Sequence, residues 1–374
     1  MKVLMISIDK GLLGRGQLGD VIERHREYGK FVERLDIIVF SKAGFSEYEV
    51  SDRVKAYPTN SSGRSKYFFD ALRISRELFK KNKYDLIITQ EPFLTGLVGV
   101  KLKKSFGGKL LVHFHGDYRG LKLLFAKLFV LPKVDAIRVM SRGQKDILIK
   151  NRIKPSLINV ISTPVNLEKF INYENKNPEH QERILSLNNT QKSKKIILMV
   201  GRKDEVKDFN TLFKAITLVY EKDKNIGLRL VGNYEPAEAE SLSLPEGLKN
   251  DGGVFISGRI DSNDLPAYYK TSYLVVLSSK SESFGKVLIE ANACGKPVIS
   301  TATTGAKEII RDGYNGYLAP IGDAKALADK ILFLLNNPEK AKKMGENGQS
   351  LVAENYSGNS DKITNLWREI IESK

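Results

Sequence analysis

Short runs of β-branched and other apolar residues alternate along the chain with longer segments in which apolar residues recur at helical spacing. Segments such as 67–81 and 211–221 are amphipathic and predict helices. The apolar runs predict strands at 3–8, 36–40, 85–89, 110–114, 136–140 and 159–161, and then at 196–200, 228–231, 254–257, 274–277, 298–300 and 316–318. Strands that alternate with helices are typical of parallel sheets. We therefore expect an α/β protein with two doubly wound domains in tandem.

The pattern weakens over residues 167–195, where polar residues replace apolar ones and Pro178 interrupts any helix. We assign this segment as a linker between an N-terminal domain of residues 1–166 and a C-terminal domain of residues 196–357. Residues 358–374 predict one more amphipathic helix, and we expect it to pack back on the N-terminal domain. Its apolar stripe comprises Ile363, Leu366, Trp367, Ile370 and Ile371.

The cysteine and histidine content limits the chemistry of the chain. Its single cysteine, Cys294, leaves no intrachain disulfide, and four histidines supply too few ligands for a structural zinc site. This composition favours a reducing, cytoplasmic setting. The longest apolar stretch, 121–131, is interrupted by Lys122 and Lys127, so no segment is expected to cross a membrane.

The positive charge is concentrated in one half of the chain. Residues 1–170 contain 32 Lys and Arg against 17 Asp and Glu, a net charge of +15, whereas the remainder has a net charge of +1. Such a field attracts an anionic partner and weakens with salt, although a solubilising surface would have the same composition. Within this half, 119–133 combines an apolar stripe with four cationic residues. It predicts either a helix that lies on an anionic bilayer or a core helix with cationic flanks.

Residues 281–299 read SESFGKVLIEANACGKPVI and predict a glycine-containing turn followed by a helix that leads into a strand. The backbone N–H groups of Ser283, Phe284 and Gly285, together with the helix dipole, would form an anion site suited to a diphosphate. Glu282 and Glu290 are spaced to point into one site, where carboxylates accept hydrogen bonds from sugar hydroxyls. A surface glutamate that complements the helix dipole is the alternative.

A second segment, 200–207, reads VGRKDEVK and follows a predicted strand. Arg202 and Lys207 could neutralise a departing diphosphate as its charge grows in the transition state. Solvated surface cations are the alternative. In the first half, Gly14 and Gly16 belong to a glycine-rich turn after the first strand, where the backbone could approach a phosphate or a sugar. Because no acidic ribose partner closes the next strand, this turn does not indicate a dinucleotide site.

Residues 281–299 resemble the signature of family 4 glycosyltransferases, in which two glutamates are separated by seven residues. The matching positions are Glu282, Phe284, Gly285, Glu290, Ala291, Ala293, Gly295, Pro297, Val298 and Ile299. Segments 200–207, 255–260 and 303–318 are also similar to that family, with Asp208 and Thr304 at positions where the family has glycine. The resemblance implies a GT-B fold, in which two Rossmann-like domains face a central cleft. The N-terminal domain would bind the acceptor and the C-terminal domain the nucleotide sugar.

The resemblance also implies roles for individual residues. Glu290 would hold the nucleotide ribose, Glu282 would lie near the transferred sugar, and Arg202 and Lys207 would stabilise the leaving phosphate. His115, just before Gly116-Asp117, would lie beside the donor sugar. The remaining expected donor contacts are Ser283, Phe284, Gly285, Lys286, Gly201, Arg259, Ile260, Gly14 and Gly16.

These roles describe a retaining hexosyltransferase that moves a sugar from a UDP- or GDP-linked donor to a glycan, a lipid-linked or another anionic acceptor by a front-face mechanism. Since the chain has no Asp-x-Asp triplet, we expect it to need no metal and no other cofactor. We expect a cytoplasmic enzyme, peripheral on the inner face of the membrane. A GT-B sugar-nucleotide epimerase or phosphorylase remains open, as does a basic protein that binds nucleic acid or another polyanion, although nucleic acid leaves the two glutamates unexplained.

Overall fold

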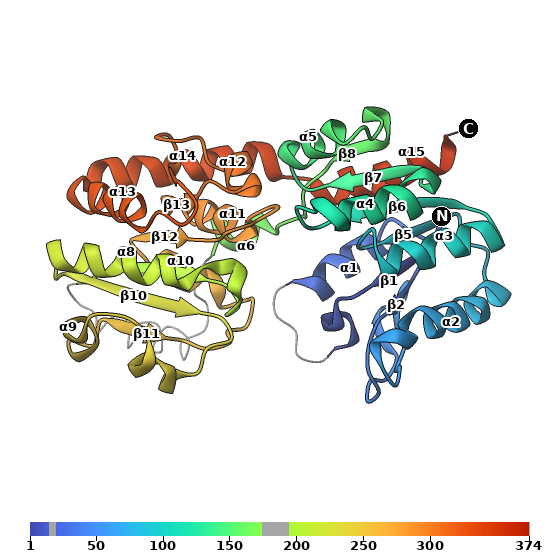
Figure 1. Cartoon of the computed structure of the whole chain (residues 1–374), viewed down its shortest axis with the longest axis horizontal. Helices are drawn as coiled ribbons and strands as arrows, with labels where there is room; N and C mark the ends of the chain where they lie inside the picture. The colour runs from blue at the N-terminus through green and yellow to red at the C-terminus, as the bar shows by residue number, and fades with distance from the viewer. Residues whose placement is uncertain (15–19, 174–193, 374) are drawn as a thin grey trace. The chain divides into compact units, whose positions relative to one another are not determined.

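The computed structural model describes residues 1–14, 20–173 and 194–373. The chain forms two compact units, one of Met1–Pro164 with Gly358–Lys374 and one of Val165–Ser357. Each unit is a parallel or mainly parallel sheet with helices (Figure 1). The two tandem α/β domains expected from the alternating pattern are therefore confirmed.

The sheet of the first unit has the strand order β3-β4-β2-β1-β5-β6-β7-β8. All neighbours are parallel except β3 and β4. Its strands are β1 Lys2–Ser7, β2 Arg34–Val39, β3 Tyr48–Ser51, β4 Val54–Pro58, β5 Leu86–Thr89, β6 Lys109–Phe114, β7 Ala136–Val139 and β8 Ile158–Val160. Its helices are α1 Val21–Gly29, α2 Tyr67–Lys81, α3 Leu94–Phe106, α4 Gly120–Phe129, α5 Arg142–Lys150 and α15 Asn359–Glu372, with short 3-10 turns η1 Lys10–Leu13, η2 Arg64–Lys66, η3 Leu131–Lys133 and η4 Pro155–Leu157.

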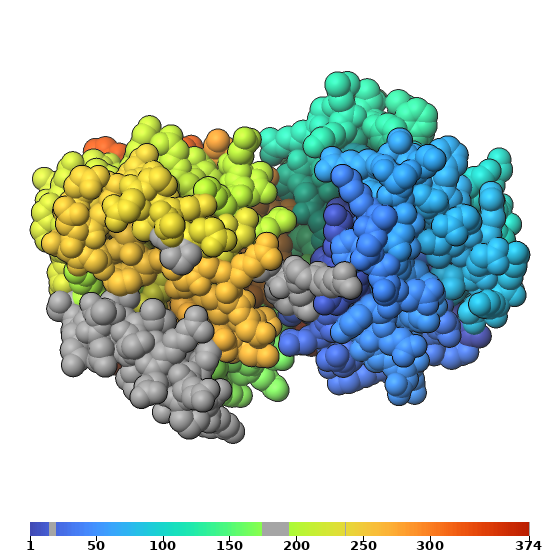
Figure 2. All heavy atoms as spheres, turned by 90° about the horizontal axis from the view of Figure 1, so that it is seen from below, coloured from blue at the N-terminus to red at the C-terminus, as the bar shows by residue number. Residues whose placement is uncertain are grey.

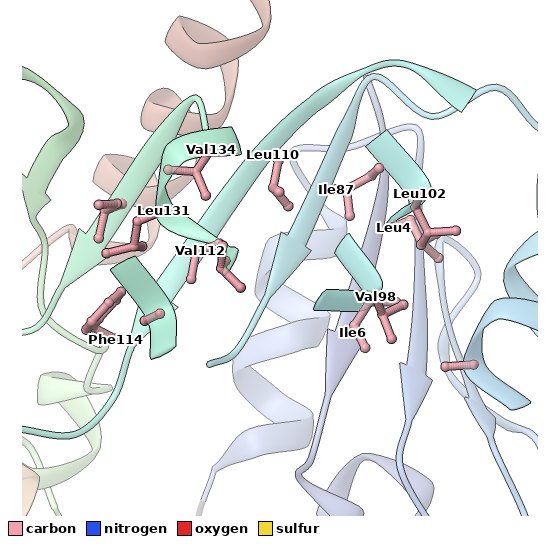
Figure 3. Close-up of a cluster of buried hydrophobic side chains, with 14 of the residues drawn as sticks. Leu4, Ile6, Ile87, Val98, Leu102, Leu110, Val112, Phe114, Leu131 and Val134 are labelled. Carbon is pink, nitrogen blue, oxygen red and sulfur yellow. The ribbon is translucent and has the colours of Figure 1, made fainter. Parts of the chain in front are cut away.

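Two apolar clusters cover the two faces of this sheet. Alternate residues of one strand point to opposite faces, so Leu4 and Ile6 join one cluster and Val3 and Met5 the other. The first cluster is completed by side chains of α2, α3, α4 and α5, some of which are shown in Figure 3. The second is completed by α1 and α15, including the fully buried Trp367. The C-terminal apolar stripe is thus buried against the first unit, as expected.

The antiparallel pair β3 and β4 is the part of this sheet that the apolar pattern does not predict. The two strands are joined at Asp52 and Arg53 and lie at the sheet edge, with β3 outermost. Strand β3 reads YEVS and β4 reads VKAYP, so neither forms an uninterrupted apolar run, and only alternate residues of β4 are fully buried.

The sheet of the second unit has the order β11-β10-β9-β12-β13-β14 and is entirely parallel. Its strands are β9 Lys195–Val200, β10 Ile226–Val231, β11 Val254–Ile256, β12 Leu274–Leu277, β13 Val298–Thr301 and β14 Gly316–Ala319. Its helices are α6 Leu167–Ile171, α8 Phe209–Lys222, α9 Glu246–Asn250, α10 Leu265–Lys270, α11 Lys286–Ala293, α12 Thr304–Ile309, α13 Ala324–Asn336 and α14 Pro338–Tyr356, with η5 Glu205–Lys207 and η6 Pro236–Ser241. In Figure 2, the yellow residues, which include η6 and α9, gather on one face of this unit, beside the edge strand β11.

The described part of the predicted linker is residues 167–173 and 194–195. It contains α6, which belongs to the second unit, and the first residue of β9. In α6, Phe170 packs its ring against Tyr269 of α10 at 5.9 Å between centroids. The rest of the linker lies outside the described residues.

Candidate functional site

The strand order of the second unit marks one place where a ligand is expected. Neighbours run from β11 to β9 in descending order and then jump to β12, so the direction of winding reverses between β9 and β12. In open α/β sheets, ligands bind beyond the carboxyl ends of the strands at such a switch point. The two loops that leave these strands are 201–208 and 278–285, and both were singled out by their sequence motifs.

The loop after β9 is held by hydrogen bonds to the loop after β12. Ser278 donates from Oγ to the carbonyl oxygen of Lys207 at 2.8 Å, and the backbone N–H of Lys280 donates to the carbonyl of Val206 at 2.7 Å. Asp208 then begins α8 in the left-handed region, with φ 47°, and its carboxylate accepts a hydrogen bond from the Thr211 hydroxyl at 2.7 Å. Aspartate tolerates this conformation better than most residues, so it fits the position at which the family pattern has glycine.

The turn before α11 is fixed by close contact with α12. The backbone N–H of Gly305 donates to the carbonyl of Glu282 at 2.6 Å. A Cβ at Gly305 would lie 2.5 Å from backbone atoms of Phe284, so no other residue fits without displacing the turn. Gly285 precedes the helix with φ 86°, and the Phe284 side chain is buried. The Ser283–Gly285 backbone is thereby held at the amino end of α11, as the predicted anion site requires.

Lys207 and Glu282 join the two loops. Lys207 Nζ lies 2.5 Å from Glu282 Oε2, and both side chains are about four-fifths buried, with 18% and 21% of their surfaces exposed. The structure therefore brings together the cation of one predicted motif and the first carboxylate of the other. Because both groups are largely withdrawn from water, each depends on the other for charge compensation.

Glu290 lies in the second turn of α11 and is only 4% exposed. Its carboxylate accepts a hydrogen bond from the Tyr269 hydroxyl at 2.8 Å and faces Lys286 Nζ at 3.3 Å. Burial, followed by the negative charge of Glu290, raises the pKa of Tyr269 well above its usual value, so the phenol remains a hydrogen-bond donor. The orientation of Glu290 is thus set by α10 and by its own helix.

Tyr269 is a contact of the site that the motifs do not indicate. It is fully buried in the short helix α10. A buried tyrosine usually has a partner for its hydroxyl, but only the fold identifies Glu290 as that partner.

The loop after β9 also meets the loops after β10 and β11. The backbone N–H of Gly201 donates to Val231, and that of Gly232 donates to the carbonyl of Gly258, both at 2.9 Å. A Cβ at Gly232 would lie 1.9 Å from the carbonyl oxygen of Gly201, so the loops touch through their backbones. The expected contacts Arg259 and Ile260 directly follow Gly258, with Arg259 exposed and Ile260 half-buried.

Arg202 lies in the loop after β9 but is exposed. Its guanidinium forms no ion pair or hydrogen bond with the described residues. The structure therefore brings Lys207 and Glu282 together, but it does not add Arg202 to their ion pair.

The remaining candidates belong to the first unit. His115 is exposed at the end of β6, with its ring 5.6 Å from that of His113. His113 is buried, and its Nδ1 lies 3.5 Å from the guanidinium of Arg138. Burial, and then the positive charge of Arg138, keeps the pKa of His113 well below its usual value. Gly14 ends η1 in the left-handed region, and Gly16 lies outside the described residues.

The loop that holds Gly14 lies at the switch point of the first sheet, whereas His115 follows β6, the next strand beyond it. In the first unit the strand order reverses between β1 and β5, and the glycine-rich turn follows β1.

Over residues 1–14, 20–173 and 194–373, no group of three or more His, Cys, Asp or Glu side chains is placed to hold a metal ion.

Two family models match the chain, one in the N-terminal and one in the C-terminal part. "Glycosyl transferases group 1" matches residues 181–351, and "Glycosyltransferase Family 4" matches residues 31–169. An uncharacterized glycosyltransferase of Methanocaldococcus jannaschii is 28% identical over 363 residues, which cover 93% of this chain and 92% of that protein.

Two solved structures have the same fold over the full length of the chain. Sucrose-phosphate synthase of Thermosynechococcus elongatus superposes with a TM-score of 0.82 at 23% identity, covering 100% of both chains. HepE of Anabaena, solved with UDP and glucose, superposes with a TM-score of 0.76 at 19% identity and the same coverage. At these identities the likeness shows the fold alone.

Proposed function

Because this chain is a family 4-like glycosyltransferase with the GT-B fold, we propose that it transfers a hexose-type sugar from a UDP- or GDP-linked donor with retention of configuration. The acceptor class is a glycan, a lipid-linked or another anionic molecule. The contact between Lys207 and Glu282 carries the proposal, since it joins the two motif loops at the switch point of the second unit.

The donor nucleotide is assigned to the second unit. Glu290 is buried and already oriented by Tyr269, so its carboxylate can accept hydrogen bonds from the two ribose hydroxyls without being reorganised. The backbone at Arg259 and Ile260 is assigned to the nucleobase. That HepE was solved with UDP and glucose supports a uridine donor as the first choice.

Transfer requires that the negative charge on the departing diphosphate be stabilised. The amino end of α11, with Ser283, Phe284, Gly285 and Lys286, is assigned to the diphosphate, where backbone N–H groups and the helix dipole favour an anion. Lys207 is the nearby cation, and when the donor binds it would exchange Glu282 for a phosphate oxygen. Arg202, exposed in the same loop, is free to turn toward the same charge.

With these cations on the leaving group, we expect the reaction to require no metal ion. The leaving phosphate would accept the proton of the attacking hydroxyl on the same face of the sugar, which yields retention without a covalent intermediate. Glu282, released from Lys207, would then contact the transferred sugar. His115 and Gly14 remain the proposed donor contacts of the first unit.

The acceptor is assigned to the first unit because the excess positive charge lies there, with +15 over residues 1–170. A cytoplasmic position, peripheral on the membrane, belongs to the same proposal. Within residues 1–14, 20–173 and 194–373, the helices lack the combination of length and apolar composition that a membrane span requires.

The proposal is tested by measuring release of UDP or GDP from a panel of nucleotide sugars, with and without glycan and lipid-linked acceptors. Acceptor-dependent release supports a transferase, and the anomeric coupling constant of the product by NMR reports retention or inversion. Conversion of the donor to an isomer without any acceptor would instead identify an epimerase. Transfer to phosphate alone would identify a phosphorylase.

A further inference from the structure

The helix α4 of the first unit exposes most of its apolar side chains. Only two of its ten residues, Leu123 and Ala126, are fully buried, and both join the cluster that covers one face of the sheet. Four large apolar residues point to solvent, with exposed fractions of 83% for Leu121, 48% for Leu124, 60% for Leu128 and 49% for Phe129. Packing in the core, one of the two interpretations of residues 119–133, therefore accounts for only one side of the helix.

The exposed apolar residues form one continuous face. They occur at intervals of three, four, seven and eight residues, and at about 100° per residue they cover, with the half-buried Phe125, an arc of roughly 140°. Phe125 and Phe129 also contact each other, with ring centroids 5.0 Å apart. Isolated surface leucines are ordinary, but a contiguous apolar face indicates an interaction site.

The charged residues on α4 and next to it in the sequence are all positive, and Glu91 of a neighbouring loop is a carboxylate that interacts with Lys122. At the same angular spacing, Lys122 and Lys127 fall on either side of the apolar arc, where each separates it from the buried side. Arg119 precedes the helix and Lys133 follows it, and residues 118–134 contain no Asp or Glu. An apolar face bordered by lysines is the arrangement of a helix that lies in the plane of a bilayer, with the ammonium groups at the level of the headgroups.

We propose that α4 with Arg119 and Lys133, called here the α4 surface, docks the protein on an anionic lipid bilayer. A protein partner would need acidic groups at two opposite borders of an apolar groove, whereas an anionic membrane offers negative charge in every direction around the inserted side chains. The location of α4 within the first unit is seen in Figure 1. The inference extends the proposed function to the partner surface, but docking itself needs no donor.

The test is flotation of the full chain with vesicles of phosphatidylcholine alone or with about a third phosphatidylglycerol. The wild type is expected to float with anionic vesicles only, and less at high salt. Leu121→Ser with Leu128→Ser removes exposed apolar area without touching the core and should weaken binding at least tenfold. Lys122→Gln with Lys127→Gln should weaken it about 25-fold, roughly fivefold for each lysine.

Matched controls are Phe69→Ser, an equally exposed apolar residue on α2, and Lys150→Gln with Lys154→Gln, two exposed lysines of the same unit. These should bind as the wild type does. The proposal is overturned if the wild type does not float, or if it floats equally well with neutral vesicles. It is also overturned if the control variants lose as much binding as the test variants, or if the protein is a dimer that the leucine substitutions dissociate. Nucleotide binding by the leucine variant should be unchanged, which separates failure of docking from failure of the donor site.

Discussion

The Tyr269 hydroxyl donates a hydrogen bond to Glu290 Oε2 at 2.8 Å, so a short helix outside the motifs orients the carboxylate assigned to the ribose. Tyr269→Phe removes this donor from a buried carboxylate. We expect a loss of about 1.5 to 3 kcal/mol in stability, because the bond is to a charged group. The donor KM should rise roughly tenfold with a smaller change in kcat, since the tyrosine acts through Glu290. Steady-state kinetics that show a large fall in kcat and no change in KM would contradict this positioning role.

Lys207 is expected to act on the leaving group. Lys207→Met keeps most of the side-chain volume but removes the charge, and we expect kcat to fall by about 10² to 10³, the usual effect of losing one charge-stabilising group. The matched control is Lys214→Met, an exposed lysine on α8 in the same unit, which should leave kcat unchanged. Equal kcat values for Lys207→Met and the wild type would remove Lys207 from the reaction.

Asp208 combines a left-handed backbone with a helix-capping carboxylate. Asp208→Ala loses the cap and keeps the unfavourable φ, so we expect unfolding free energy to fall by about 2 to 3 kcal/mol. Asparagine and glycine tolerate φ 47°, so the unfolding free energy of Asp208→Asn and of Asp208→Gly should fall by no more than about 1 kcal/mol. Urea denaturation of the three variants gives the ranking, and an alanine variant as stable as the glycine variant would disprove the explanation.

His25 makes the first unit sensitive to acid. It is 2% exposed, its Nδ1 lies 2.7 Å from the carbonyl of Val21, and burial, then Arg24, lowers its pKa from 6.5 to about 3. Below pH 6.5 the unfolded chain binds a proton that folded His25 does not, so stability falls with pH until about 3. At pH 5 this amounts to about 2 kcal/mol.

The measurement is the unfolding free energy at pH 7 and pH 5 for the wild type and His25→Leu. The leucine variant should lose about 2 kcal/mol less than the wild type over this interval, whatever its stability at pH 7. An identical pH dependence of the two proteins would show that His25 titrates normally in the folded state.

Much of the fold follows from the sequence because parallel strands buried on both faces leave uninterrupted apolar runs. All twelve predicted strands are present, with bounds shifted by a residue or two, and helix α2 has the predicted bounds Tyr67–Lys81. The hairpin β3–β4 is not predicted because polar residues interrupt the apolar ones in both of its strands, YEVS and VKAYP. In such strands, buried residues alternate with more exposed ones, so burial leaves no continuous apolar run in the sequence.

The site was predictable where a motif marks it and not where only tertiary contact does. Glu282, Glu290 and Lys207 follow from spacing and resemblance. The sequence carries no sign of the Tyr269 hydrogen bond, because it joins residues 21 positions apart on different helices. The sequence likewise does not show that Lys207 pairs with Glu282 while Arg202 stays exposed. This difference depends on the conformation of the loop, which is held by a hydrogen bond from Ser278.

The central claim, that the second unit binds a nucleotide-sugar donor through Glu290, is tested most directly by thermal unfolding with UDP, GDP, ADP and their sugars. The measurement includes Glu290→Gln and, as a control, Glu339→Gln at the exposed start of α14. We predict that one nucleotide series raises the Tm of the wild type and of the control. At a hundredfold excess over Kd, the free energy of unfolding of these two proteins should increase by about 2.7 kcal/mol. The increase should be much smaller in Glu290→Gln. No response to any nucleotide, or an equal response in Glu290→Gln, would contradict the account.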